Sequence, residues 1–402
     1  MKTALTKKLS ILFLIIFLVL GNYSSLYSWG FYAHRKINRM AVFTLPSGMI
    51  GFFKKHIEYI TEHSIDPDKR AHTVEGEAPK HYMDLEQYGH PDSIPMYWRD
   101  AVARYTEDTL LTHGMLPYHI YTMYFRLKEA FKEEDLDKIL FNAANIGHYI
   151  ADGCTPLHNT KFYNGRTPEE RGVHALWETR VPELTADSYD FFVGRAVYIE
   201  KPALFAWQLV RESNALVDTI YNVLEQMLKD FPADKMYTFE NRGQTLRREY
   251  SHEFASAFHQ KTNKMVEKQM RKSILAVGSM WLTAWVDAGQ PDLNRLENKE
   301  ISEQHKKEIK ELERVVTMYL DYAENQAARQ IPMKMADWVQ KIDAFLQFNE
   351  YKILKDAGKV SHEVAKKLAE KEYEKYRVIQ DKNFESDFDK EVKKLNPPKK
   401  KK

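Results

Sequence analysis

Apolar residues recur at helical spacing along most of the chain. Five stretches carry apolar side chains that return every three or four residues: Ile37–Phe43, Tyr118–Phe131, Ile139–Ile150, Leu204–Leu228 and Ile274–Val286. This period places apolar side chains on one face of an α-helix. No convincing run shows the alternation of apolar and polar residues that a half-buried β-strand would have. The segment Thr167-Pro-Glu-Glu170 predicts a further helix start, with a capping threonine and a proline in the first turn. The pattern therefore predicts an all-α protein.

The pattern changes near residue 295. From Glu297 onward, Lys and Glu dominate stretches such as ENKEISEQHKKEIKELERVV and EVAKKLAEKEYEKYRV. Such segments form solvated helices, and the final PPKKKK is typical of a disordered basic tail. We therefore expect a folded core over residues 29–295. A charged helical extension that ends in this tail should occupy residues 296–402.

The first 28 residues have the pattern of a secretory signal peptide. Three lysines precede an apolar run from Leu9 to Leu20, which is too short to span a bilayer, and small residues follow up to Ser28. An uncleaved membrane anchor is the alternative, because Leu26 is larger than is usual three positions before a cleavage site. Cleavage after Ser28 would make this an exported protein, periplasmic or extracellular.

Composition excludes several classes of protein. The chain has 402 residues, of which 44% are hydrophobic and 29% charged, as in an ordinary globular protein. Its formal net charge of +2 falls to −1 when residues 1–28 and their three lysines are removed, so a basic surface that coats nucleic acid is not expected. The single cysteine, Cys154, excludes an intramolecular disulfide. The sequence contains no Gly-rich phosphate loop, so a nucleotide cofactor is not expected.

Two pairs of metal-ligand residues repeat the same spacing. In GHYIADGCTPLH, His148 and Asp152 are four residues apart, and in VHALWE so are His174 and Glu178. Residues four apart share one face of an α-helix, so each pair can reach one ion. His158 follows beyond a proline that turns the chain. For one such pair a solvated hydrogen bond is the commoner interpretation, but two pairs among apolar neighbours favour a metal site.

Further donors lie earlier in the chain. Asp66 and Asp68 flank a proline, and His81 follows in KHYMD. A turn or capping role is the alternative for the two acids. His34 comes five residues after Trp29, the first residue after signal-peptide cleavage. The free amine and carbonyl of Trp29 would chelate a metal through a five-membered ring, with His34 as a side-chain ligand.

The segments WGFYAH, HYMD, GHYIADGCTPLH and HALWE, in this order, resemble the zinc-dependent phospholipase C and single-strand-specific nuclease superfamily. The resemblance lies between Trp29 and Glu178, extends over a helical core to about residue 290, and has no counterpart for the charged region. It implies a multi-helix core that holds three zinc ions in one cleft. Glu178 matches the phospholipase members, whereas Trp177 and the step from Trp29 to His34 match the nucleases.

The resemblance also implies ligands for each ion. The three sets are Asp68, His81, His148 and Asp152; Trp29, His34 and Asp152; and His158, His174 and Glu178. Asp152 would bridge the first two ions. Asp68 is preferred over Asp66 because an arginine follows it closely, but the sequence does not separate these two acids.

Such a cluster would hydrolyse a phosphodiester, either a phospholipid headgroup or single-stranded nucleic acid. Zinc would lower the pKa of a water toward neutrality. The catalytic residues would be Asp68, which could orient that water or accept its proton, and the bridging Asp152. Three tyrosines are candidates for base stacking or for a peripheral membrane contact, with core packing as their alternative: Tyr32, Tyr82 and Tyr163. The alternative function is a non-catalytic exported helical protein with a structural metal and a charged interaction surface.

Overall fold

The computed structural model describes residues 30–71, 73–242, 245–297, 299–304, 306–307 and 310. These residues all belong to the first of two compact units into which the chain divides, Met1–Pro332. The expected signal peptide, the ligand Trp29 and nearly all of the charged extension with its basic tail lie outside the described residues. Those three expectations therefore stay predictions.

The described residues are mostly helical, as the apolar spacing predicts. The α-helices are α2 Phe31–Ala41, α3 Ser47–Lys55, α4 Ile57–Glu62, α5 Asp66–Ala71, α6 Trp98–Tyr105, α7 Glu107–His113, α8 Leu116–Lys132, α9 Leu136–Gly153, α10 Val173–Ala175, α11 Val181–Thr185, α12 Pro202–Asn214, α13 Val217–Asp230, α14 Ala233–Met236, α15 His252–Lys261, α16 Met265–Asp287 and α17 Asn294–Glu297. Short 3-10 helices are η1 Val42–Thr44, η2 His63–Ile65, η3 Ala78–Lys80, η4 Leu85–Gln87, η5 Pro91–Ser93, η6 Pro156–Asn159 and η8 Ala186–Ser188. The segment η7, Leu176–Arg180, is a π-helix.

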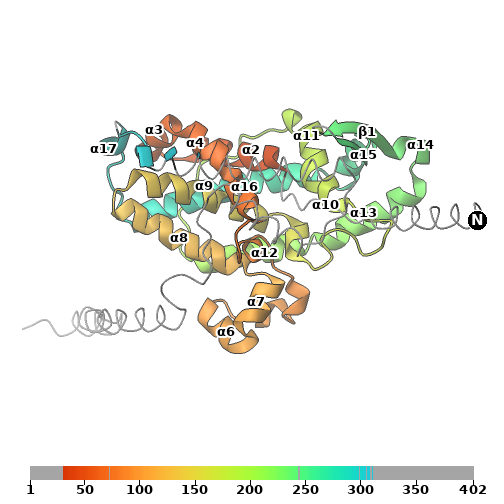
Figure 1. The fold of residues 1–402 in the computed structure, drawn as a ribbon, viewed down its shortest axis with the longest axis horizontal. Coiled ribbons are helices and arrows are strands. Elements are labelled where there is room, and N and C mark those ends of the chain that lie inside the picture. Colours follow the sequence, from red (N-terminus) through yellow and green to blue (C-terminus); the bar gives the residue numbers. More distant parts are fainter. Residues whose placement is uncertain are drawn as a thin grey trace, which may run out of the picture. The chain divides into compact units, whose positions relative to one another are not determined.

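Helix α9 lies at the centre of the packed unit. Every residue from Asn142 to Gly153 is buried. Helix α8 runs beside α9, α16 packs against both, and α2 and α4 also contact α9 (Figure 1). Trp281 of α16 donates its indole N–H to the backbone oxygen of Ala143 at 3.0 Å. A helix that is apolar nearly all round is buried, so polar side chains on it need partners inside the protein.

A close approach between α2 and α9 is fixed by one asparagine and one glycine. Asn38 donates its side-chain N–H groups to the backbone oxygens of Ala144 and Ile60, at 2.9 and 3.3 Å. A Cβ at Gly147 would lie 2.1 Å from Oδ1 of Asn38. The absence of a side chain at residue 147 therefore lets the two helices approach each other next to His148.

The fold differs from the sequence-based expectation at 237–250, where a β-hairpin forms. Strands β1 (Tyr237–Arg242) and β2 (Thr245–Tyr250) pair in antiparallel register, with Tyr237 opposite Tyr250. Arg180 holds this hairpin against η7, because its Nε donates to the backbone oxygen of Tyr250 at 2.9 Å and its guanidinium forms a two-point ion pair with Glu240. The apolar stretch Leu204–Leu228 also divides into two helices, α12 and α13.

The helix start expected at Thr167 is wrong. Residues 167–172 form turns, and the next helix begins at Val173. The carboxylate of Glu170 accepts hydrogen bonds from the backbone N–H groups of Arg166 and Thr167, at 2.7 and 3.2 Å. The bond from Thr167 is one of the two bonds of a capping box. Here the two bonds to Glu170 close a turn that is not continued into a helix.

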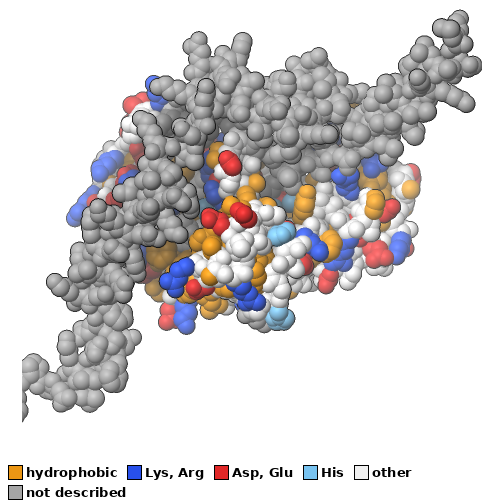
Figure 2. Space-filling model, turned by 60° about the horizontal axis from the view of Figure 1, so that its bottom comes forward, with side chains coloured by type: hydrophobic (Ala, Val, Ile, Leu, Met, Phe, Trp, Pro, Cys, Tyr) orange, Lys and Arg blue, Asp and Glu red, His pale blue; other side chains and the backbone are white. Residues whose placement is uncertain are grey.

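The described surface carries charges of both signs. On the face shown in Figure 2, Lys and Arg side chains are interspersed with Asp and Glu, with apolar groups between them. This distribution agrees with the low net charge of the sequence. Within the described residues, no helix has both the length and the apolar character required to cross a membrane.

Candidate metal centre

Helix α9 supplies two donors that lie one turn apart. Nε2 of His148 lies 3.2 Å from Oδ2 of Asp152, and both side chains are fully buried. Nδ1 of His148 lies 2.8 Å from the backbone oxygen of Ser64. Because a carbonyl oxygen only accepts, we assign the proton of a neutral His148 ring to Nδ1, which leaves a lone pair on Nε2. The pair expected from the four-residue spacing is therefore formed and points into the interior.

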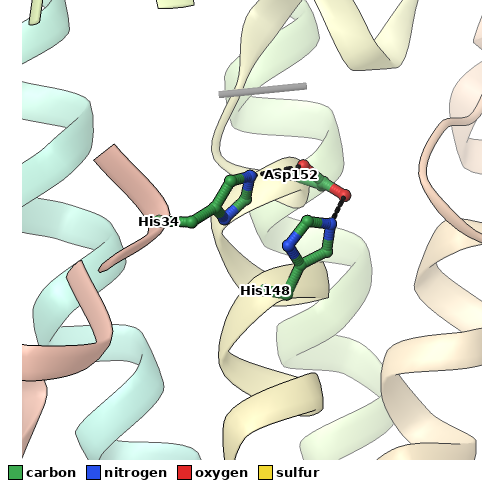
Figure 3. A group of neighbouring side chains, drawn as sticks. All are labelled: His34, His148 and Asp152. Carbon is green, nitrogen blue, oxygen red and sulfur yellow. Dashed lines mark ion pairs between the residues drawn. The ribbon is translucent and has the colours of Figure 1, made fainter. Parts of the chain in front are cut away.

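Helix α2 brings His34 to the same carboxylate. Nε2 of His34 lies 3.5 Å from Oδ1 of Asp152. Its ring stacks on that of His148, with centroids 3.9 Å apart and an interplanar angle of 18°. Figure 3 shows the two imidazoles approaching the carboxylate from two helices. The donor atoms of these three residues lie within 4.8 Å of one another, so they could hold one ion as a first group.

A second group joins the first at His148. Asp68 of α5 places Oδ1 3.4 Å from Nε2 of His148 and 3.7 Å from Nδ1 of His81, which follows η3. Nδ1 of His81 lies 3.0 Å from Nε2 of His148 and 3.0 Å from Oδ2 of Asp152. The second group is thus Asp68, His81 and His148. It matches the first ligand set expected from the sequence, with Asp152 in contact.

Asp66 and Asp68 have different partners in the structure. The carboxylate of Asp66 lies 2.7 Å from Nδ1 of His63 and accepts from the ammonium of Lys69 at 2.9 Å. These ion pairs lower the pKa of Asp66, although burial opposes the effect. Asp68, two residues later, faces the histidines of the second group instead.

The third group comes from η6 and the α10–η7 segment. Oε2 of Glu178 lies 2.8 Å from Nε2 of His174 and 3.3 Å from Nε2 of His158. The four-residue pair is formed here too, although the helix widens to π-geometry at Leu176. Such π-turns are rare and often occur at functional sites. The third group contains the three residues expected from the sequence.

The three groups are parts of one cluster. Nδ1 of His158 lies 3.6 Å from Oδ1 of Asp152, and 2.7 Å from the backbone oxygen of His81. We use the term eight-residue cluster for His34, Asp68, His81, His148, Asp152, His158, His174 and Glu178. All eight residues are buried, and His174, at 8%, is the most exposed of them.

The donor chemistry fits metal ions. Among the described residues, the buried atoms of the cluster without a hydrogen-bond partner include Oδ2 of Asp68, Nε2 of His81 and Oε1 of Glu178. A buried polar atom without a partner costs about 1–3 kcal/mol. Imidazole nitrogens and carboxylate oxygens are zinc ligands, and a cation offsets the charge of three adjacent acids. The cluster can therefore hold metal.

Burial and mutual contact shift the pKa values of the cluster in opposite directions. Burial opposes a charge on His148, but Asp152 and Asp68 outweigh it and raise the pKa of His148 to about 10. Burial and the neighbouring His148 keep the pKa of His34 well below its usual value. Burial raises the pKa of Glu178 to about 8, although His158 beside it has the opposite effect. Without metal, the positive charge thus lies on His148 and His34 stays neutral, because two charged rings in a stack would repel each other.

The N-terminal end of the described chain lies beside the third group. The backbone N–H of Gly30 donates to the backbone oxygen of Glu178 at 3.1 Å. Trp29, the expected ligand that precedes it, lies outside the described residues. Of the three candidate tyrosines, Tyr163 contacts the cluster, with its ring 5.7 Å from that of His174. Tyr32 and Tyr82 direct their hydroxyls to Asp187 and to the backbone oxygen of Thr112.

A polar network behind His81 was not expected from the sequence. Its members are Arg70, Glu77, Lys80, Tyr149 and the neighbouring His119. A signal was present, because Tyr149 follows the metal-ligand candidate His148 directly and carries a hydroxyl into a buried helix. Buried tyrosine hydroxyls usually have a hydrogen-bond partner. The identity of that partner, however, is a matter of tertiary structure.

The comparisons with known proteins point away from the family suggested by the motifs. The model of the virulence protein RhuM family matches residues 251–385. No curated protein matches the sequence. The assignment to the zinc-dependent phospholipase C and nuclease superfamily is therefore wrong, because the matching family model is a different one. The match covers about a third of the chain and begins after every residue of the eight-residue cluster, so the chemistry of the cluster rests on its own geometry.

Proposed function

We propose that this protein is a zinc-dependent phosphodiester hydrolase. The observation that carries the proposal is the convergence of five histidines and three acids, from segments far apart in the sequence, into one buried cluster. Burying so many polar groups is costly unless each has a partner. A fold that needed only stability would be served as well by apolar residues here. The arrangement is best explained by bound metal ions.

The chemistry follows from the donor set. Bound zinc would supply Lewis-acid chemistry and bring the pKa of water toward neutrality. Asp68 would orient that water or accept its proton, because its Oδ2 has no hydrogen-bond partner. Asp152 would serve two groups at once, since each of its oxygens faces a different histidine. The fully buried Cys154, whose pKa is raised by burial, is unsuited to act as a nucleophile.

The substrate would approach beside His174, the most exposed member of the cluster. Tyr163, which is 41% exposed, flanks that side. An aromatic ring there suits a nucleobase or an apolar part of a lipid equally. Phospholipid headgroups and single-stranded nucleic acid therefore both stay as candidate substrates, and a lipid substrate would add a peripheral membrane contact.

The test is metal content together with turnover. Purified protein should contain about three zinc ions per chain and hydrolyse bis-nitrophenyl phosphate. A chelator should abolish the turnover, and added zinc should restore it. Parallel assays on phosphatidylcholine vesicles and on single-stranded DNA would identify the substrate class. Protein that takes up zinc but hydrolyses none of these phosphodiesters would contradict the proposal.

A second candidate, a non-catalytic exported protein with a structural metal, is favoured by the depth of the cluster. Structural zinc sites are closed, whereas catalytic ones keep an open position. Deletion of the charged region distinguishes the two functions, because an interaction surface there would be lost while hydrolysis would not. The cut should fall after residue 310, since Leu296 is buried and the backbone N–H of Ser302 bonds to Asp137.

Both functions assume export, which depends on residues 1–28. The intact mass of the exported protein would show whether the chain begins at Trp29. A chain that retained residues 1–28 would have no free amine at Trp29, and the corresponding ligand would be lost.

A further inference from the structure

Tyr149 and Glu77 form a buried pair directly behind the cluster. The Tyr149 hydroxyl donates to Oε1 of Glu77 across 72 residues of sequence. The ammonium of Lys80 and the guanidinium of Arg70 donate to the same carboxylate, at 2.5 and 3.3 Å. Tyr149 is 1% exposed and Glu77 is 3% exposed. Two polar side chains are thus withdrawn from water beside two partly exposed cations, an arrangement that seldom adds stability over apolar packing.

The pair connects three segments that carry cluster residues. Tyr149 belongs to α9, next to His148. Glu77 directly precedes η3, which leads to His81. Arg70 belongs to α5, two residues after Asp68, and also donates to Oδ1 of Asn145 on α9 at 2.5 Å. The network therefore fixes the spacing of the segments that supply the second group.

His81 lacks the backbone support that His148 and His158 have. His148 and His158 each direct Nδ1 to a backbone oxygen, that of Ser64 and that of His81. For His81, Nδ1 faces the cluster and Nε2 is buried without a hydrogen-bond partner. The ring of His81 instead meets the ring of Tyr149, with centroids 5.4 Å apart and an interplanar angle of 64°.

Displacement of His81 would also reach the third group. The backbone oxygen of His81 holds Nδ1 of His158 at 2.7 Å, and the backbone N–H of Met83 donates to the backbone oxygen of His158 at 2.8 Å. The segment that carries His81 thus connects the second and third groups. Groups that orient metal ligands without touching the metal commonly change metal affinity 10–100-fold, as an order of magnitude.

We propose that the hydrogen-bonded pair Glu77–Tyr149 positions His81 and thereby sets the metal affinity of the second group. Neither side chain donates to the metal. The pair acts by holding the η3 segment against α9, so that Nδ1 of His81 stays 3.0 Å from both Nε2 of His148 and Oδ2 of Asp152. This inference rests on the proposed metal site but not on turnover.

The variant Tyr149→Phe tests the pair because it keeps the ring and removes the hydroxyl. Zinc affinity should fall by about tenfold or more, measured by competition with a chromogenic chelator. Glu77→Gln should weaken binding similarly. The double variant should bind zinc about as well as the weaker single variant, because both changes break one interaction. Independent, additive losses would show that the two residues do not act as a pair.

A matched control separates positioning from general stability. Tyr118 is also buried on a helix, and its hydroxyl donates to the backbone oxygen of Pro95 at 2.7 Å, away from the cluster. Tyr118→Phe should lower the urea midpoint as much as Tyr149→Phe does while zinc affinity stays at the wild-type level. Equal zinc affinity in Tyr149→Phe and wild type would overturn the positioning role. Wild-type protein that binds no zinc would instead refute the proposed metal site, and zinc binding without hydrolysis would refute only the proposed reaction.

Discussion

Oδ2 of Asp152 lies 3.0 Å from Nδ1 of His81, a residue 71 positions earlier in the chain. The same oxygen is 3.2 Å from Nε2 of His148. The other oxygen, Oδ1, is 3.5 Å from Nε2 of His34 and 3.6 Å from Nδ1 of His158. One carboxylate thus contacts imidazoles from four segments. Asp152 is the point at which the three groups of the cluster meet.

Replacing that carboxylate should therefore weaken metal binding in more than one group of the cluster. Asp152→Asn removes one negative charge and one donor oxygen from the first and second groups. We expect the zinc content to fall by about two ions per chain and phosphodiester hydrolysis to fall at least about 100-fold. Zinc analysis and a bis-nitrophenyl phosphate assay measure the two effects.

Asp66→Asn is the matched control, because Asp66 is also a buried acid but pairs with His63 and Lys69. It should cost some stability and leave zinc content unchanged. If Asp152→Asn kept its full zinc content, the central role of Asp152 would be wrong.

The contact between α2 and α9 can be tested at a glycine. Gly147→Ala would place a Cβ 2.1 Å from Oδ1 of Asn38, whose amide is held by two backbone oxygens. The helices must then separate, which also moves His34, one turn before Asn38, away from His148. We expect a loss of about 1–3 kcal/mol in the free energy of unfolding, together with weaker zinc binding.

Gly153→Ala is the control on the same helix. The nearest atom to a Cβ at Gly153 is Cδ1 of Ile120 at 3.4 Å, so an alanine there should be accepted with little change. Urea unfolding of both variants makes the comparison. A Gly147→Ala protein as stable as Gly153→Ala would show that the close approach is not required.

Arg180 links the β-hairpin to the helix that carries Glu178. It is buried, and its guanidinium bonds to Glu240 and to the backbone oxygen of Tyr250. Arg180→Ala should destabilise the protein by about 1–3 kcal/mol, because the carbonyl of Tyr250 loses its donor and the partly exposed Glu240 loses one ion pair. Amide hydrogen exchange in β1 and β2 should accelerate. The exposed Arg248 on the same hairpin provides the control, since Arg248→Ala should cost less than about 1 kcal/mol.

The parts of the site that depend on local geometry could be predicted from the sequence. The pairs His148 with Asp152 and His174 with Glu178 follow from the helical period, which holds even where η7 widens to a π-helix. The role of Asp68 could not be predicted in the same way. Asp66 and Asp68 both lie in the first turn of α5, and only the packing of α5 on α9 determines which carboxylate faces the histidines.

Secondary structure, too, could be predicted from the sequence only in part. In the hairpin, Tyr237 and Phe239 alternate with polar residues, but both strands are short and rich in charge, so no apolar face stands out. At Thr167 the capping residues are present, yet Glu170 bonds back to close a turn. Local signals permit a structure, and contacts with distant residues decide whether it forms.

His119 gives a prediction about pH. Burial, with a smaller effect from Lys80, lowers the pKa of His119 from 6.5 to about 3. The unfolded chain therefore binds a proton on this residue below about pH 6.5 that the folded protein excludes, so stability falls as the pH decreases toward the folded pKa. Between about pH 7 and about pH 5, this one residue should remove about 2 kcal/mol from the free energy of unfolding.

His119→Gln, which does not titrate, should show a correspondingly weaker pH dependence in urea titrations at these two pH values. Contributions from the metal ligands occur in both proteins and cancel in the comparison. Equal pH dependence in the two proteins would mean that His119 is accessible to protons in the folded state.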